Sequence, residues 1–192
     1  MIQLDYHWHK WCAVALLLFG CDEAALCRLD GMCRLWPDDA YALASRAHLL
    51  MQQGCIDRAL QDSARLVVLR PDHAGIWFNR GYMLEFAERW DEALAAFQRA
   101  TVLGPQLDRA WYGLGLVLIR LQRFDEAVVA LERNTELQPL SPYGWYQLAR
   151  VHVDRKESEA AEKIIRHLHG FEPKVAAQLV RETGLLVGKP AR

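Results

Sequence analysis

Apolar and small residues recur along this chain with the spacing of amphipathic helices. Between residues 77 and 100, two triplets follow an i, i+4, i+7 spacing: Trp77, Gly81, Leu84 and then Ala93, Phe97, Ala100. At about 100° per residue, the members of each triplet lie on one helical face. The pattern predicts a pair of short helices, in which small residues allow close approach and Trp77 and Phe97 supply apolar area.

The pattern returns every 34 residues. Five prolines keep this period at Pro37, Pro71, Pro105, Pro139 and Pro173. Trp77 recurs in phase as Trp111 and Trp145, and each is followed four positions later by a small residue. Because one helical pair cannot bury its apolar face alone, a fixed period of this length predicts repeats that pack mainly on their neighbours.

These residues resemble the tetratricopeptide repeat family, whose pattern matches Trp77, Gly81, Leu84, Ala93, Phe97, Ala100 and Pro105. The next repeat reads Trp111, Leu114, Gly115, Leu118, Ala127, Leu131 and Pro139. The resemblance implies an all-α, right-handed α-solenoid of five helix-turn-helix repeats. Counting at the period places the repeats at 6–39, 40–73, 74–107, 108–141 and 142–175. A C-terminal capping helix at about 174–187 and a frayed tail at 188–192 complete a single domain over 1–192.

The match is weaker in the first two repeats. His9 replaces the tryptophan in the first repeat, and Arg46 and Ser63 depart from the pattern in the second. Polar residues after the repeat prolines are placed to cap the following helices, namely Asp38, Asp39, Asp72, Asp108 and Ser141.

Composition narrows the function classes. The 192 residues are 52 % hydrophobic with a formal net charge of -1, which argues against bulk attraction to nucleic acid or anionic membrane. The five cysteines, Cys12, Cys21, Cys27, Cys33 and Cys55, fit neither a disulfide framework nor a paired metal site. We expect them to be small buried residues in a reducing cytoplasm, with a redox or metal role as the alternative.

The N-terminal segment allows two interpretations. Residues 11–20 are apolar, and Leu18-Phe19-Gly20-Cys21 loosely resembles a bacterial lipoprotein cleavage box. Ala13 and Leu16 are nevertheless in phase with the later repeats, so we favour a first helix followed by Cys21 as a helical residue. The surplus apolar residues of this segment suggest contact with something else, and membrane contact and a homodimer both stay open.

No catalytic, cofactor or metal site is expected. His7 with His9 and His167 with His169 are each two residues apart, so they point about 200° apart on a helix and cannot share an ion unaided. Gly113 and Gly115 do not follow a strand, as a phosphate-binding loop requires. We therefore expect a protein that is not an enzyme.

The resemblance directs attention to the first-helix flank, which lines a concave groove in this family. The positions one and five after each repeat tryptophan are Phe78, Tyr82, Tyr112, Leu116, Tyr146 and Arg150. Neighbours on the same face are Asn79, Glu85, Arg109, Ile119, Arg120 and Tyr143. We call these twelve residues the predicted row. Tyrosine and arginine carry much of the energy of protein interfaces, so the row predicts a partner-binding surface, with lateral helix packing as the alternative.

The best-known ligand mode of this family, a clamp for a C-terminal carboxylate, does not match. Its positions read Ala44, His48, Asn79, Arg109 and Gly113, of which only Asn79 and Arg109 fit. We expect a cytoplasmic adaptor or assembly chaperone that binds a protein or peptide partner in its groove. The alternatives are a membrane-tethered, lipoprotein-like assembly factor and a regulatory subunit of an enzyme complex.

Overall fold

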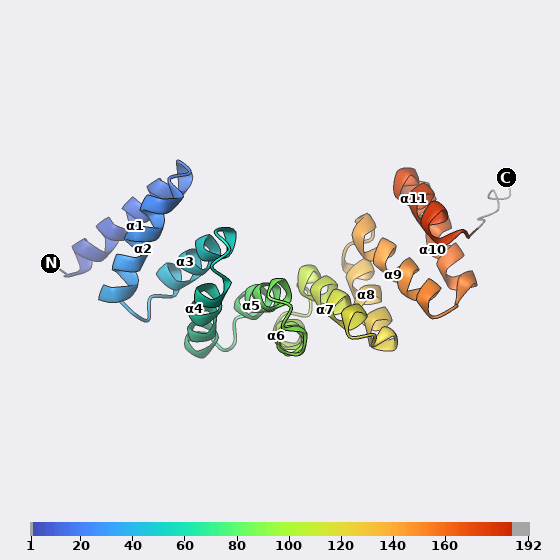
Figure 1. Ribbon diagram of the computed structural model, residues 1–192, viewed down its shortest axis with the longest axis horizontal. Helices are drawn as coiled ribbons and strands as arrows, with labels where there is room; N and C mark the ends of the chain where they lie inside the picture. Colours follow the sequence, from blue (N-terminus) through green and yellow to red (C-terminus); the bar gives the residue numbers. More distant parts are fainter. Residues whose placement is uncertain (1, 186–192) are drawn as a thin grey trace. The chain divides into compact units, whose positions relative to one another are not determined.

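The computed structural model describes the backbone of residues 2–185 and the side chains of residues 5–185, and within them it contains α-helices and no strand (Figure 1). The helices are α1 (Ile2–Leu18), α2 (Asp22–Leu35), α3 (Ala40–Gln52), α4 (Ile56–Leu69), α5 (Ala74–Phe86), α6 (Trp90–Leu103), α7 (Asp108–Arg120), α8 (Phe124–Leu137), α9 (Pro142–Asp154), α10 (Ser158–Phe171) and α11 (Pro173–Thr183). The all-α prediction is confirmed.

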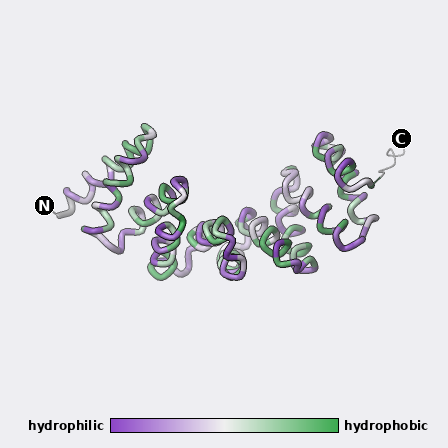
Figure 2. The backbone as a smooth tube through the Cα atoms, in the orientation of Figure 1, coloured by the Kyte–Doolittle hydropathy of each residue, from purple (hydrophilic) through white to green (hydrophobic). Residues whose placement is uncertain are grey.

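The helices form two compact units. The first unit holds α1 to α5 and the second holds α6 to α11. Within each unit every helix packs on the next one along the chain, and α11 packs on both α10 and α9. Apolar and polar residues alternate along each helix, as the colours in Figure 2 show, so each helix buries one face against its neighbours.

The helix α11 lies where a C-terminal capping helix is expected. It buries Ala176 and Leu179 against the preceding pair and ends at Gly184, which has a left-handed φ of 70°. Residues 186–187 of the expected capping helix and the expected tail at 188–192 lie outside the described residues. Within the described residues, no helix is both long enough and apolar enough to cross a membrane.

The turn inside each repeat has one geometry. A residue with a left-handed φ of 56° to 75° ends the first helix, and the next residue donates its backbone N–H to a carbonyl five positions earlier at 2.8–2.9 Å. These left-handed residues are 34 apart: Gly20, Gly54, Glu88, Gln122 and Lys156. Gly20 and Cys21 thus form the first of these turns, and Cys21 precedes α2 and is exposed. The expectation of a helical Cys21 is wrong, because the chain must reverse there.

The repeat tryptophans are anchored by hydrogen bonds as well as by packing. The indole N–H groups of Trp77, Trp111 and Trp145 donate to the carbonyls of the repeat prolines six residues earlier, at 2.8, 3.0 and 2.9 Å. Each indole is half-buried. The shared period of tryptophan and proline therefore reflects one contact, which fixes the entry of the chain into the first helix of the repeat.

Helix capping follows the sequence prediction in one place. The Asp39 carboxylate accepts the backbone N–H of Ala42 at 2.7 Å and caps α3. At α5 the cap is His73, whose Nδ1 accepts the N–H of Ile76 at 3.3 Å. No side chain caps the N-terminus of α7 or α9, where the N-cap residues are Leu107 and Ser141. The capping prediction is wrong for Asp72, Asp108 and Ser141.

Large side chains of second helices press against glycines of first helices in the second unit. A Cβ placed on Gly113 would lie 2.6 Å from the Phe97 ring, and one on Gly115 would lie 2.7 Å from the Leu131 side chain. Both distances are too short for real atoms. The close approach of α7 to α6 and α8 therefore requires glycine at these positions.

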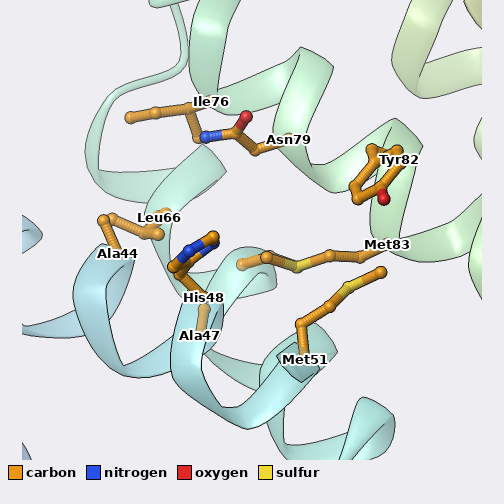
Figure 3. A pocket seen from close by; sticks show the side chains of 10 residues that line it. Ala44, Ala47, His48, Met51, Leu66, Ile76, Asn79, Tyr82 and Met83 are labelled. Atoms are coloured by element: carbon orange, nitrogen blue, oxygen red, sulfur yellow. The ribbon is translucent and has the colours of Figure 1, made fainter. Parts of the chain in front are cut away.

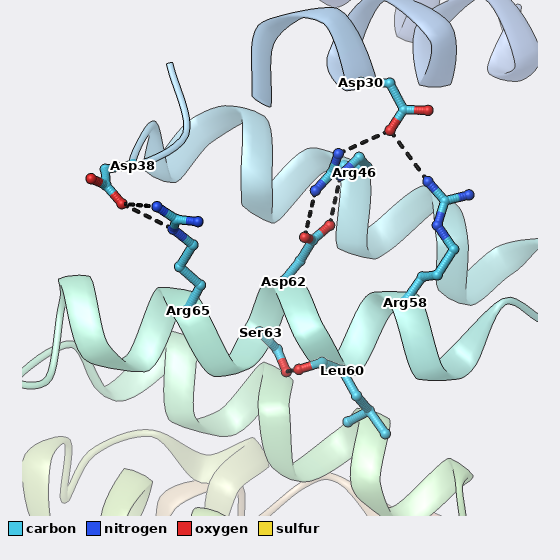
Figure 4. Close-up of polar contacts among 8 residues, drawn as sticks. All are labelled: Asp30, Asp38, Arg46, Arg58, Leu60, Asp62, Ser63 and Arg65. Atoms are coloured by element: carbon cyan, nitrogen blue, oxygen red, sulfur yellow. Dashed lines mark hydrogen bonds and ion pairs between the residues drawn. The ribbon is translucent and has the colours of Figure 1, made fainter. Parts of the chain in front are cut away.

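The first unit replaces part of this apolar layer with charge (Figure 4). Arg46 on α3 stands at the place in the repeat that Leu114 and Leu148 occupy, and it donates two hydrogen bonds to the Asp62 carboxylate, at 2.8 and 2.6 Å. It also donates to Asp30 on α2 at 2.9 Å. The paired carboxylates hold the pKa of the Arg46 guanidinium above its ordinary value, with the bonds to Asp62 as the main cause. One arginine thus ties together α2, α3 and α4.

Asp62 is only 6 % exposed, so its buried negative charge is stabilised by the ion pair with Arg46 and not by water. We predict that Arg46→Ala lowers the free energy of unfolding by about 3–5 kcal/mol, because it leaves a buried carboxylate without its partner. The measurement is urea unfolding followed by circular dichroism.

The matched control removes both charges. In Arg46→Leu with Asp62→Ala, the pair takes the residues that Leu114 and Ala130 supply at the same places in the fourth repeat. We expect this double variant to be at least as stable as the parent within about 1 kcal/mol, because well-packed apolar residues commonly replace a buried ion pair without loss. Equal destabilisation by the single and the double change would contradict the assigned role of Arg46.

Candidate functional site

A pocket opens in the first unit between α3 and α5, with α4 behind it (Figure 3). Its volume is about 100 Å³. Its lining side chains are Ala44, Ala47, His48 and Met51 from α3, Ser63 and Leu66 from α4, and Ile76, Asn79, Tyr82 and Met83 from α5. The size suits one aliphatic or thioether side chain rather than a whole cofactor.

The pocket exists because a large residue is missing. Ser63 stands at the place that Phe97, Leu131 and Ile165 fill in the later repeats, where each is almost completely buried. The Ser63 hydroxyl donates to the Leu60 carbonyl at 2.9 Å and accepts a hydrogen bond from Arg80 at 3.0 Å. These two hydrogen bonds hold the Ser63 side chain in place. The space that the Phe97 ring fills one repeat later stays open beside Ser63.

The opposite wall of the pocket is changed as well. Asn79 stands at the place of Gly113, the glycine that faces Phe97 in the second unit. Asn79 is exposed, and among the described residues its amide has no hydrogen-bond partner. In the second unit a large residue of the second helix, Phe97, faces a glycine of the first helix. At the pocket the sizes are exchanged, because the small Ser63 is on the second helix and the larger Asn79 is on the first. An amide that can donate and accept is presented at the rim of an apolar hollow.

The rest of the lining is soft and polarisable. Met51 and Met83 are half-buried and buried, and their flexible side chains adapt to different occupants. His48 and Tyr82 are exposed at the pocket and add two further polar side chains beside Asn79. The arrangement combines an apolar interior with a polar rim, the usual composition of a site that anchors one side chain of a ligand.

Four residues of the predicted row lie in the first unit, all on α5. Asn79 and Tyr82 line the pocket, while Phe78 and Glu85 are half-buried. Sequence reasoning did not identify the α3 side of the pocket, including His48 as a lining residue, because the second repeat matches the family pattern weakly. The usable signal was Ser63, a small polar residue at a position that is otherwise large and apolar.

Eight residues of the predicted row lie in the second unit, on α7 and α9. Four are exposed, namely Arg109, Arg120, Tyr143 and Arg150, and four are half-buried, namely Tyr112, Leu116, Ile119 and Tyr146. The guanidinium of Arg120 lies 5.7 Å from the centre of the Trp90 ring. That of Arg150 lies 5.8 Å from the centre of the Tyr146 ring, so two arginines of the row are already stacked on aromatic faces.

Tyr146 takes part in the packing of the capping helix. Its hydroxyl donates to the Glu182 carboxylate of α11 at 2.5 Å, and Gln178 donates to the same carboxylate at 2.8 Å. The bond to Glu182 is the main cause that raises the pKa of the Tyr146 hydroxyl. At this end of the row, α11 therefore supplies part of the surface beside α9.

The five positions compared with the carboxylate clamp of the family do not supply its set of basic and amide side chains. His48 and Asn79 line the pocket together, and Gly113 is buried under the Phe97 ring. Among the described residues, no group of three or more histidine, cysteine or acidic side chains could hold a metal ion.

The expectation of buried cysteines is mostly wrong. Only Cys33 is buried, Cys12 is half-buried, and Cys21, Cys27 and Cys55 are exposed. The reason lies in their places: Cys21 and Cys55 occupy the turns before α2 and α4, and Cys27 is on the outer side of α2.

Comparisons with solved structures return helical repeat proteins. A tetratricopeptide repeat protein from Parabacteroides merdae superposes with a TM-score of 0.82 at 19% identity, over 93% of this chain and 73% of that one. MamA from Desulfovibrio magneticus RS-1, residues 41 to the end, gives 0.77 at 21% identity, over 92% and 96%. YrrB, described as a TPR protein with an unusual peptide-binding site, gives 0.78 at 19% identity, over 88% of each chain. At these identities the likeness establishes the fold.

A family model described as tetratricopeptide repeat matches the sequence three times, over residues 44–108, 86–142 and 112–168. Together these matches cover well over half of the chain. A comparison with curated proteins found no match.

The cysteines differ in a way that alkylation can measure. Burial raises the pKa of the Cys33 thiol to about 11, so almost none of it is the reactive thiolate at pH 8. We predict that iodoacetamide at this pH modifies the exposed Cys21, Cys27 and Cys55 at least tenfold faster than Cys33, as read by peptide mass mapping. In denaturant the difference should vanish. Equal labelling of Cys33 and Cys55 in the folded protein would mean that α2 does not stay packed on α3.

Proposed function

The chain belongs to the tetratricopeptide repeat family, and we propose that it acts as a non-catalytic adaptor or assembly chaperone that holds a segment of a partner protein. The fold supports the coarser statement, a protein-protein interaction module. The pocket between α3 and α5 supports the more specific proposal, that this module holds a segment of a partner protein.

The pocket is suited to one anchor side chain of an extended peptide. A volume of about 100 Å³ with Met51, Leu66, Ile76 and Met83 in its lining favours leucine, isoleucine or methionine. Burying such a side chain contributes about 1.5–3 kcal/mol. That is enough to select a peptide that carries it, but not to hold the peptide alone.

Asn79 supplies the second element of recognition. Its amide lies at the rim without a partner among the described residues, and a peptide backbone offers one donor and one acceptor at every residue. A bidentate contact between this amide and the peptide backbone would fix the direction of the segment. The apolar interior of the pocket thus selects the anchor side chain, and Asn79 aligns the peptide backbone.

The predicted row in the second unit is a separate candidate surface. Its exposed Arg109 and Tyr143, with the half-buried Tyr112, have the composition of interface hot spots. We propose that it contacts partner residues outside the anchor. The likeness to YrrB, whose description names a peptide-binding site, supports peptide recognition for this fold. A cytoplasmic location stays part of the proposal.

We predict that filling the pocket weakens peptide capture. In Ser63→Phe with Asn79→Gly, the pair takes the residues of Phe97 and Gly113, so the ring has a glycine to pack against. Peptides selected by the parent protein from a random library displayed on phage provide the probe. Their affinity, measured by fluorescence anisotropy, should fall about thirtyfold, equivalent to about 2 kcal/mol. Circular dichroism and the melting temperature should show that the fold is retained.

Two further variants locate the contact. Asn79→Ala removes the exposed amide and leaves the apolar interior in place, and we expect about a tenfold loss of affinity. Tyr112→Ala with Arg150→Ala tests the second unit, and Arg133→Ala on α8 is the matched control. Unchanged affinity in the filled variant would refute the pocket as the anchor site, and a loss confined to the Tyr112 and Arg150 changes would assign binding to the predicted row.

A further inference from the structure

An exposed apolar stripe runs along α1. At about 100° per residue, Trp8, Trp11, Ala15, Leu18 and Phe19 fall within an arc of about 100°. The exposed fractions of the four large residues are 64 %, 69 %, 79 % and 84 %. Scattered exposed apolar residues are ordinary, whereas four on one face of α1, with Phe19 directly after its end, form a patch.

Two positions of the stripe, those of Trp8 and Ala15, lie on the face through which repeats stack. The place of Trp8 in the repeat is held by Ala42 in α3, Ala110 in α7 and Gly144 in α9, and all three are buried. The place of Ala15 is held by Leu49, Val117 and Val151, which are 2 % exposed or less. In each of these helices that face packs on the second helix of the preceding repeat. In α1, nothing among the described residues covers it.

We propose that a second copy of this chain covers the stripe, with the two α1 helices antiparallel about a two-fold axis near Ala15. The order of the residues is self-complementary in this arrangement. Trp11 of one copy lies opposite Phe19 and beside Leu18 of the other, Trp8 lies within about one helical turn of that Phe19, and Ala15 meets Ala15. A small residue at the crossing point allows the two helices to approach closely, while the large residues fill the space at both ends.

Charge argues against an anionic membrane as the occupant. The stripe is bordered by exposed carboxylates, Asp5 on α1 and Asp22 and Glu23 at the start of α2. The single lysine of α1, Lys10, lies over the Tyr41 ring of α3, with its ammonium 4.6 Å from the ring centre. Helices that lie in anionic membranes instead carry lysine and arginine on their polar face.

The C-terminal helix is no better suited to the stripe. The helix α11 exposes Lys174, Gln178, Arg181 and Glu182, a polar surface. Stacking of the stripe of one copy on α11 of the next would bury these charges against tryptophan, which costs free energy. A closed dimer through α1 alone avoids this cost.

The area is sufficient for a modest dimer. A buried aromatic side chain removes about 150–250 Å² from water, so at their exposed fractions Trp8, Trp11 and Phe19 offer roughly 300–550 Å² per copy. Two copies together, with Leu18 and Ala15 added, reach the roughly 1,000 Å² that a specific interface needs. We therefore expect reversible association with a dissociation constant in the micromolar range.

Sedimentation velocity of the full chain, from low to high micromolar concentration, tests the proposal. The parent protein should shift reversibly from monomer to dimer. Ala15→Glu and Ala15→Lys should each raise the dissociation constant at least tenfold, because like charges then meet at the axis. Val129→Glu, at an exposed apolar residue of α8, is the matched control and should leave the dimer intact.

The mixture of the two charge variants tests the two-fold axis itself. Equal amounts of Ala15→Glu and Ala15→Lys should recover the dimer, because Ala15 lies at the two-fold axis and faces its own counterpart, so opposite charges then meet there. If either variant is unfolded by circular dichroism, Leu18→Lys with Trp11→Glu replaces the pair, since these two positions lie beside each other across the axis.

Four results would overturn the proposal. They are a parent protein that stays monomeric throughout, a mixture of the two variants that stays monomeric, growth beyond the dimer into open chains, and binding of the parent to phosphatidylcholine vesicles that Trp11→Glu abolishes. The last result would assign the stripe to a lipid surface.

Discussion

The architecture depends on one steric constraint, that a large second-helix side chain needs a small first-helix residue to pack against. In the second unit Phe97 meets Gly113 and Leu131 meets Gly115 at distances that no side chain at the glycine could tolerate. Each such contact brings two helices close together at that point. Because the fit is this close, the size of the second-helix residue decides whether the layer is filled or open.

At Ser63 the first unit lacks this contact between a large and a small residue. Two unusual features are found there, the pocket beside Ser63 and the ion pairs of Arg46. With Ser63 in place of the large residue, α4 no longer fills the space toward α5, and the pocket remains. With Arg46 in place of a leucine, α3 is held to α2 and α4 by ion pairs to Asp30 and Asp62 instead of by apolar packing. The ion pairs retain the helix positions that the lost apolar contact would have fixed. A hollow can then persist next to a stable helical stack.

The sequence was sufficient for the helices and their pairing, because Trp77, Gly81 and Phe97 recur in phase and small residues mark the close contacts. It did not predict the left-handed turn residues, since Glu88 and Gln122 carry side chains at a conformation that glycine usually adopts. The pocket was missed because Arg46 and Ser63 each break the pattern alone, and only their partners explain them. The bond from Tyr146 to Glu182 could not be anticipated, because Glu182 lies beyond the last repeat and has no periodic counterpart.

Methionine methyl NMR during titration with a phage-selected peptide shows whether the hollow beside Ser63 is a binding site. Met51 and Met83 line the pocket, while Met32 is fully buried among the helices α1 to α3 and serves as the internal reference. We expect the methyl signals of Met51 and Met83 to shift in proportion to the bound fraction, while that of Met32 stays unchanged. Saturating peptide that leaves Met51 and Met83 unmoved would contradict this expectation.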